Sequence, residues 1–171
     1  MMTIRTAIES DAADLLDIYR PYIEQSVVSF ETEVPSLAEF ARRIADYSSG
    51  WSWLVAEEGG RCAGYAYASP HRTRAAYRWS VETSAYVHDT YRRRGLGKRL
   101  YAELFIELER KGFRNAYAGI TMPNDASVAL HRSVGFDSVG VFRNVGWKFG
   151  AWRDVAWMQR VISAAPPAEP D

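Results

Sequence analysis

The fold is decided by the run Tyr91-Arg92-Arg93-Arg94-Gly95-Leu96-Gly97-Lys98-Arg99, which joins a strand-like segment to a helix-like segment. The preceding residues, Trp79 to Val87, are rich in β-branched and aromatic side chains, as a strand would be. A leucine then recurs at every fourth position from Leu96 to Leu108, which predicts a helix with one apolar face, running to about Lys111. A basic loop between a strand and a helix is an arrangement in which proteins bind phosphate groups.

The loop itself is predicted to cradle a pyrophosphate. A helix that begins there directs its first free backbone N–H groups and its positive dipole end into the loop. Glycines without a Cβ would let an anion approach the backbone, and the basic side chains supply matching charge. A solvated helix start or a nuclear-localisation-like patch is the competing interpretation. The run lacks both the Lys-Ser/Thr ending of a nucleotide P-loop and the three-glycine dinucleotide fingerprint, which disfavours nucleotide hydrolysis and hydride transfer.

Length and composition indicate one globular domain. The chain has 171 residues, of which 47% are apolar and 13% aromatic, enough to fill a sizeable core. Its 21 basic and 21 acidic side chains balance, so no global field favours nucleic acid or an anionic membrane. A single cysteine, Cys62, excludes an internal disulfide, and we expect it to be a small buried apolar residue. Charged residues near the N-terminus stand where a signal peptide would be apolar, so we expect a soluble, cytoplasmic protein.

The remaining elements follow from local patterns. Strands are predicted at 3–8, 51–56, 62–68, 115–121, 136–142 and 155–161, with an antiparallel hairpin formed by 51–56 and 62–68. Ser10 is expected to cap a first helix, a capping box at 36–39 to open a second, and Asn124 to cap a last helix reaching about Val134. Residues 1–162 would form the domain, and 163–171 a flexible C-terminal tail, because three prolines and no apolar pattern cannot pack.

The Arg-x-x-Gly-x-Gly loop between strand and helix resembles the acetyl-coenzyme A loop of the GNAT superfamily of N-acetyltransferases. The order of predicted elements matches that α/β (α+β) fold over essentially the whole chain, which implies one domain with a central mixed, mostly antiparallel twisted sheet flanked by helices. Local segments are similar to the phosphinothricin and methionine sulfoximine acetyltransferase branch, namely 65–70, 81–87, 123–127, 135–136 and 148–154.

The resemblance implies direct transfer of an acetyl group from acetyl-coenzyme A to the α-amine of an amino-acid analogue such as phosphinothricin, methionine sulfoximine or methionine sulfone. It also implies a homodimer. The scattered histidines and the single cysteine give no metal-site pattern, so no metal is expected. An acetyltransferase for a peptide N-terminus or a polyamine, and a non-catalytic acyl-coenzyme A binding module, remain as alternatives.

Three groups are expected to serve the chemistry. Glu82, inside the strand before the loop, would act as the base for the amine and contact the substrate; pairing with Arg78 or exposure to solvent is the alternative. The resemblance implies that backbone groups of Ala85, Tyr86 and Val87 bind the cofactor, and that the Val87 N–H donates a hydrogen bond to the acetyl oxygen. His131 would protonate the leaving thiolate, or else it would only pack against Phe136.

The other expected contacts lie at the two ends of the cleft. On the cofactor side, Asn124, Ser127 and Ser133 join the loop residues Arg92, Arg93, Arg94, Gly95, Leu96, Gly97 and Lys98. On the substrate side, arginines of the basic segment 69–78 would each donate two hydrogen bonds to a carboxylate or phosphinate. The substrate candidates, supported mainly by the resemblance, are Phe30, Arg72, Thr73, Arg74, Tyr77, Lys148 and Trp152.

Overall fold

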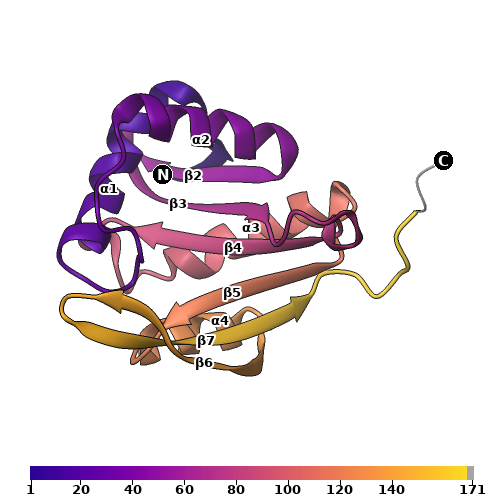
Figure 1. Cartoon of the computed structure of the whole chain (residues 1–171). Coiled ribbons are helices and arrows are strands. Elements are labelled where there is room, and N and C mark those ends of the chain that lie inside the picture. The colour runs from indigo at the N-terminus through magenta and orange to yellow at the C-terminus, as the bar shows by residue number, and fades with distance from the viewer. Residues whose placement is uncertain (169–171) are drawn as a thin grey trace.

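One mixed sheet of seven strands forms the centre of the computed structural model, which describes residues 1–168. The strand order is β1-β2-β3-β4-β5-β7-β6, and every neighbouring pair is antiparallel except β4 and β5. This confirms the expected fold class (Figure 1). The strands are β1 (Met2–Thr6), β2 (Ser52–Glu58), β3 (Arg61–Pro70), β4 (Ser80–Val87), β5 (Asn115–Thr121), β6 (Asp137–Lys148) and β7 (Ala151–Val161).

Four helices cover the two faces of this sheet, because alternate side chains of each strand point in opposite directions. On β2, Trp53 and Val55 pack with α1 (Ala12–Glu24) and α2 (Leu37–Gly50), whereas Leu54 and Ala56 pack with α3 (Leu96–Arg110). The fourth helix, α4 (Asp125–Ser133), packs against α3, where a Cβ on Gly97 would come within 3.0 Å of Leu130. Two cores therefore lie back to back across the strands.

The beginnings of the helices test the predicted caps. Ser36 accepts a hydrogen bond from the Glu39 N–H at 3.2 Å, and Asn124 accepts one from the Ser127 N–H at 3.1 Å, so both of these caps are confirmed. The cap predicted at Ser10 is wrong. Residues Glu9–Asp11 form the short 3₁₀ helix η1, and α1 begins after it.

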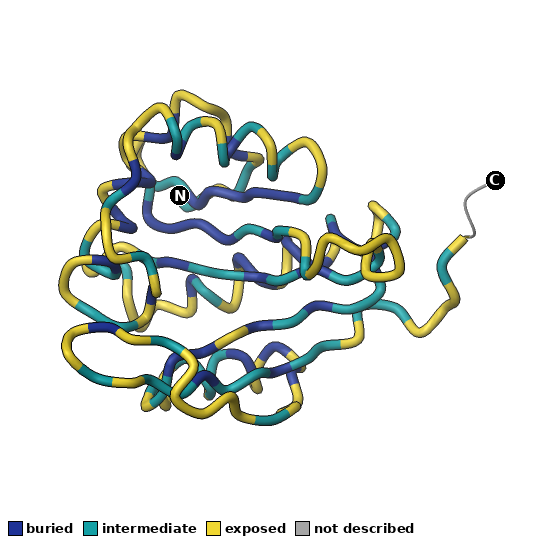
Figure 2. The backbone as a smooth tube through the Cα atoms, in the orientation of Figure 1, coloured by how far each residue is buried: buried dark blue, intermediate teal, exposed yellow. Residues whose placement is uncertain are grey.

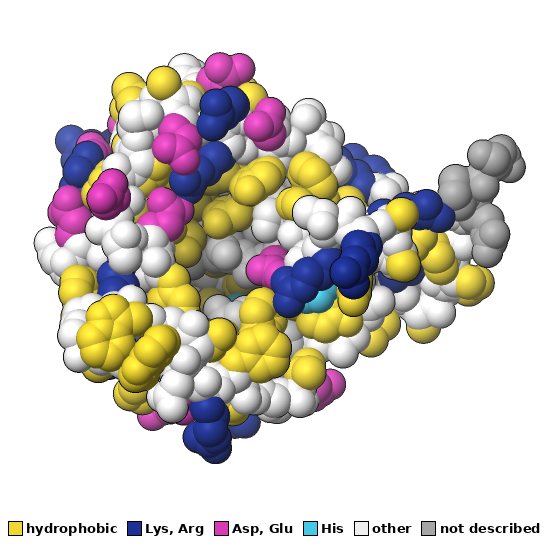
Figure 3. All heavy atoms as spheres, viewed as in Figure 1, with side chains coloured by type: hydrophobic (Ala, Val, Ile, Leu, Met, Phe, Trp, Pro, Cys, Tyr) yellow, Lys and Arg dark blue, Asp and Glu magenta, His cyan; other side chains and the backbone are white. Residues whose placement is uncertain are grey.

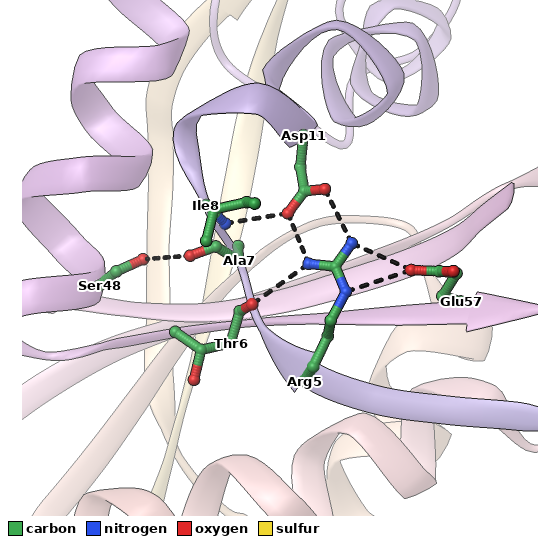
Figure 4. A network of polar contacts seen from close by, with 7 residues as sticks. All are labelled: Arg5, Thr6, Ala7, Ile8, Asp11, Ser48 and Glu57. Atoms are coloured by element: carbon green, nitrogen blue, oxygen red, sulfur yellow. Dashed lines mark hydrogen bonds and ion pairs between the residues drawn. The ribbon is translucent and has the colours of Figure 1, made fainter. Parts of the chain in front are cut away.

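Asp11 explains why the first helix begins late. Its carboxylate accepts the Ile8 N–H at 2.9 Å and both terminal nitrogens of Arg5 at 2.8 Å, and Arg5 also reaches Glu57 at 3.0 Å (Figure 4). The hydrogen bond with Arg5 is the main reason why the pKa of Asp11 lies below its usual range. This network ties β1, η1 and β2 together at the edge of the sheet.

The last two strands extend well beyond the predicted segments 136–142 and 155–161. They form one long hairpin that turns at Phe149 and Gly150, both with positive φ, and its register is irregular between Phe142 and Gly146. The sequence underestimates it because glycine and asparagine in its middle disfavour strands. Much of this hairpin is exposed (Figure 2), including Val141, Val145, Trp147 and Trp152.

The C-terminal segment is described only in part. Residues 163–168 lie in no helix or strand, although Arg114 contacts Pro166 O at 3.4 Å; the rest of the predicted tail, 169–171, lies outside the described residues. Among residues 1–168, no helix combines the length and apolar character needed to cross a membrane. The same residues contain no cluster of three or more His, Cys, Asp or Glu side chains suited to a metal ion.

Candidate active site

The parallel strands β4 and β5 are joined only at one end. Their pairing covers Ser80 to Glu82 on β4 and Asn115 to Tyr117 on β5, and beyond these pairs the two strands diverge (Figure 1). Parallel strands that separate leave backbone groups of both edges without ladder partners, and these groups can then bind a ligand. The chain thus places a V-shaped opening in the middle of its sheet, with Glu82 at the vertex.

A cavity of about 500 Å³ lies at this opening, and Glu82 is in its wall. Figure 3 shows the hollow on this face, with acidic and basic side chains and a histidine at its rim. Glu82 is held in place, because its Oε1 is 3.1 Å from His71 Nδ1 and 3.3 Å from an Arg72 nitrogen. His71 is itself stacked on Tyr117, with ring centroids 4.5 Å apart. Arg78 instead lies over the Trp79 ring, so the predicted alternative partner of Glu82 was the wrong arginine.

The predicted substrate residues divide into two groups. Phe30 lines the cavity and Arg72 contacts Glu82, while Thr73 and Arg74 are exposed and Tyr77 lies edge-on to His71. Lys148 and Trp152 lie outside the walls of the cavity.

Lys148 is buried, and its Nζ donates to Ile23 O at 2.7 Å and to Ser29 O at 2.8 Å. Burial lowers its pKa. The side chain therefore ties the end of α1 and the loop after it to the β6–β7 hairpin. It does not line the cavity, in which a substrate contact was predicted for it. Trp152 is exposed and lies edge-on to Trp147, which also removes it from the cavity.

The basic loop folds as predicted into a turn that leads into α3. Arg93 and Gly95 have φ of 61° and 72°, and α3 begins at Leu96 without a side-chain cap, so no side chain occupies the first N–H groups of this helix. Arg92, Arg93, Arg94 and Lys98 are exposed, although Arg92 pairs with Asp89 at 2.8 Å. Gly97 has a packing role as well, because a Cβ there would meet Leu130.

A narrow cavity of about 50 Å³ lies deeper in the opening, between β4 and β5. Ala85, Tyr86, Asn124, Ser127 and His131 line it, so one space brings together five of the predicted contacts, from β4 and from α4 with its N-cap. Ser133 does not line it; its hydroxyl donates to Leu130 O at 2.7 Å.

The Val87 N–H, predicted to contact the acetyl oxygen, faces the hydroxyl of Tyr22. The nitrogen lies 3.4 Å from that oxygen, a long and weak contact, and the same hydroxyl donates to Val87 O at 2.7 Å. A ligand oxygen at this N–H would therefore displace a weak contact and leave the stronger one in place.

His131 is neutral and fully hydrogen bonded. Its Nδ1–H donates to Ser127 O at 2.7 Å, so its Nε2 accepts from the Tyr101 hydroxyl at 2.9 Å. Burial lowers the pKa of His131 and raises that of Tyr101. The ring also packs against Phe136, with centroids 5.0 Å apart, as the structural alternative predicted. Tyr101 also lines the narrow cavity.

The model of the acetyltransferase (GNAT) domain family matches residues 4–157. The chain belongs to the GNAT acetyltransferase family. It is 41% identical over 98% of its length to the phosphinothricin N-acetyltransferase of Streptomyces viridochromogenes, covering 91% of that protein. It is 35% identical to the L-methionine sulfoximine/L-methionine sulfone acetyltransferase of Salmonella typhimurium, covering 98% of this chain and 99% of that protein. The crystal structure of a Sinorhizobium meliloti phosphinothricin acetyltransferase with acetyl-coenzyme A superimposes with a TM-score of 0.93 at 38% identity, covering 98% of this chain and 94% of that one.

Several residues of this GNAT acetyltransferase site escape prediction from its sequence. Tyr22, Tyr67 and Tyr101 reach the opening from α1, β3 and α3. Tyr101 carries a usable signal, since a tyrosine inside the apolar stripe of α3 must find a partner for its hydroxyl. Tyr67 and Trp157 carry no such sequence signal, because the alternation of side chains along a strand does not reveal which face of the sheet holds a cavity.

Proposed function

We propose that this acetyltransferase moves an acetyl group from acetyl-coenzyme A directly to the α-amine of a small amino-acid analogue of the phosphinothricin, methionine sulfoximine or methionine sulfone type. The 500 Å³ cavity with Glu82 in its wall, beside the unpaired edge of β4, is the observation that carries the proposal. The names of the two relatives support this class of acceptor. The reaction forms an amide bond, breaks the thioester C–S bond and transfers one proton from the amine and one to the thiolate.

Glu82 would take the proton from the amine. An α-amine with a pKa of about 8 needs little help near neutral pH, so a carboxylate acting directly or through water is sufficient. His71 and Arg72 hold this carboxylate at the cavity wall. Arg72 would also turn toward the carboxylate of an acceptor, since a guanidinium can serve two carboxylates at once.

The cofactor would bind along the other side of the opening. The exposed basic side chains and the uncapped start of α3 suit a pyrophosphate, and the weakly engaged Val87 N–H suits an acetyl oxygen. The Tyr101–His131 pair would supply the proton for the thiolate. Cys62 lines neither of the two cavities at the opening and burial raises its pKa to about 11, which supports direct transfer over a covalent acetyl-enzyme.

A homodimer working in the cytoplasm, bound to neither nucleic acid nor membrane, completes the proposal. The exposed apolar side chains of the β6–β7 hairpin support the dimer, because a monomer seldom leaves so many together in water. They are Val139, Val141, Phe142, Val145, Trp147, Phe149 and Trp152. Light scattering that gives the mass of one chain would contradict the proposed dimer.

Thiol release from acetyl-coenzyme A, measured with a panel of acceptors, tests the function. The panel contains phosphinothricin, methionine sulfoximine, methionine sulfone, the ordinary amino acids, a polyamine and a short peptide. Selective turnover of the first three is the expected result. Preference for the peptide or the polyamine would favour the alternative acceptors, and cofactor binding without turnover of any acceptor would favour a binding module.

A further inference from the structure

A second cavity, of about 150 Å³, lies under α2 on the α1–α2 face of the sheet. We call it the inner cavity. It shares Tyr19, Glu31 and Tyr67 with the larger cavity, so the two spaces are neighbours with common walls. The rest of its lining is Phe40, Arg43, Tyr47, Trp53 and Tyr65.

Trp53 in this wall has an unpaired hydrogen-bond donor. The residue is 1% exposed, and its Nε1 is buried without a hydrogen-bond partner among residues 1–168. The ring is held by stacking on Tyr67 and Tyr65, with centroids 4.3 and 5.4 Å apart. Buried N–H groups in native proteins nearly always have a partner, so an unpaired donor in the wall of a cavity indicates where an acceptor atom binds.

The charged groups of the inner cavity are already paired with one another. Glu31 accepts from Arg43 and from the Tyr19 hydroxyl, and Arg43 also donates to Glu39. The other polar groups of the lining are the Trp53 indole N–H, which can only donate, and the hydroxyls of Tyr47, Tyr65 and Tyr67, which can donate or accept. Burial raises the pKa of Tyr65 and raises that of Tyr67 to about 12, so both of these hydroxyls keep the proton that they can donate. A cationic side chain would meet Arg43 and find the carboxylate of Glu31 occupied. An oxygen that only accepts hydrogen bonds fits this cavity best.

We propose that the inner cavity is the subsite for the oxygen-bearing end of the acceptor's side chain, with Trp53 Nε1 donating to a sulfonyl or phosphinyl oxygen. The amine would lie near Glu82, and the side chain would pass Tyr67 into the inner cavity. This inference rests on the proposed function, because it places the acceptor in the larger cavity. It explains how an enzyme can distinguish methionine sulfone from methionine, which has the same carbon chain without the two oxygens.

The kinetic test compares Trp53→Phe with the wild type on methionine sulfone and on methionine. Removing one neutral donor is expected to lower kcat/KM for the sulfone about tenfold and to change that for methionine less than twofold. Trp79→Phe is the matched control, since Trp79 lies directly before β4 and lines none of these cavities. Equal losses on both acceptors, or no loss on either, would overturn the subsite.

A binding measurement separates this inference from the proposed function. In ¹⁵N-labelled wild-type protein with coenzyme A, the indole N–H signal of Trp53, assigned from the spectrum of Trp53→Phe or from its contacts with Tyr67, is followed by NMR. Methionine sulfone is expected to move this signal, and methionine to move it much less. A moved signal without thiol release would retain the subsite and reject the proposed reaction. An unmoved signal at saturating sulfone, with water as the only neighbour of the indole, would overturn the subsite whether or not the enzyme turns over.

Discussion

On the sheet face under α3 and α4 the strands contribute mainly alanine to the core, whereas on the face under α1 and α2 they contribute mainly tyrosine and tryptophan, packed against leucine and isoleucine of the helices. Leu100, Leu104 and Leu108 on the first face have no polar atoms to satisfy and are fully buried. The second face has polar atoms at the edges of its rings and contains the inner cavity. Close aliphatic packing gives a firm base for the cofactor loop, while aromatic packing with polar edges can select among similar acceptors.

Glu82→Gln should have the largest effect on activity, and it should not change the packing of the face under α3 and α4. Loss of a general base typically lowers kcat by about 10²–10⁴-fold. Thiol release gives kcat, and calorimetry gives the affinity for acetyl-coenzyme A, which is expected to stay within a factor of two. An equal loss of cofactor affinity would show that Glu82 shapes the whole opening and does not act only on the amine.

Lys148→Met tests whether the loop over the acceptor side depends on its buried ammonium group. The substitution keeps the length of the side chain but removes the donors to Ile23 O and Ser29 O. We expect a loss of about 1–3 kcal/mol in the free energy of unfolding, measured in urea, and a higher KM for the acceptor. If the variant keeps its stability but has a higher KM for the acceptor, Lys148 is a direct substrate contact, as the sequence predicted.

Gly146→Ala should affect the acceptor side alone. A Cβ at this position would clash with the Phe30 ring, and Phe30 lines the larger cavity, so the ring must move. We expect the acceptor KM to change about tenfold with the affinity for coenzyme A unaltered. Gly140→Ala, on the same strand, is the matched control, because a Cβ there meets nothing within 4 Å. Equal behaviour of the two variants would contradict a role for Phe30 in the acceptor cavity.

His131→Asn is expected to have the smallest effect on stability, visible mainly as a change in how the free energy of unfolding depends on pH. Burial lowers the pKa of His131 in the folded chain, whereas the unfolded chain binds its proton at about pH 6.5. Its contribution to stability is therefore complete above about pH 6.5 and is lost as the pH falls from there toward the lower folded pKa. Urea unfolding of both proteins between pH 7.5 and about pH 5 should show a shallower slope for the variant. Parallel slopes would mean that folding does not change the pKa of His131.

The sequence predicts well whatever depends on local pattern. The leucine repeat gives α3, Ser36 and Asn124 give two caps, and the basic loop gives the family. Ser10 failed as a cap because Asp11, one residue on, accepts from the Ile8 N–H and from Arg5, and Arg5 is held there by Glu57, which is 52 residues away in the sequence. Lys148 illustrates the same limit, because its two carbonyl partners come from residues more than a hundred positions away. Such contacts depend on tertiary packing, which no local pattern contains.

Both edges of the V-shaped opening are fixed by the strands outside it, since β4 is paired with β3 as far as Val87 and β5 is paired with β7 as far as Thr121. Glu82 belongs to the last residue pair that joins β4 to β5, and Val87 lies five residues farther along β4. At about 3.3 Å per residue these two positions are roughly 17 Å apart. The candidate base and the Val87 N–H therefore lie on one continuous ladder, which sets the distance between the two ends of the reaction site.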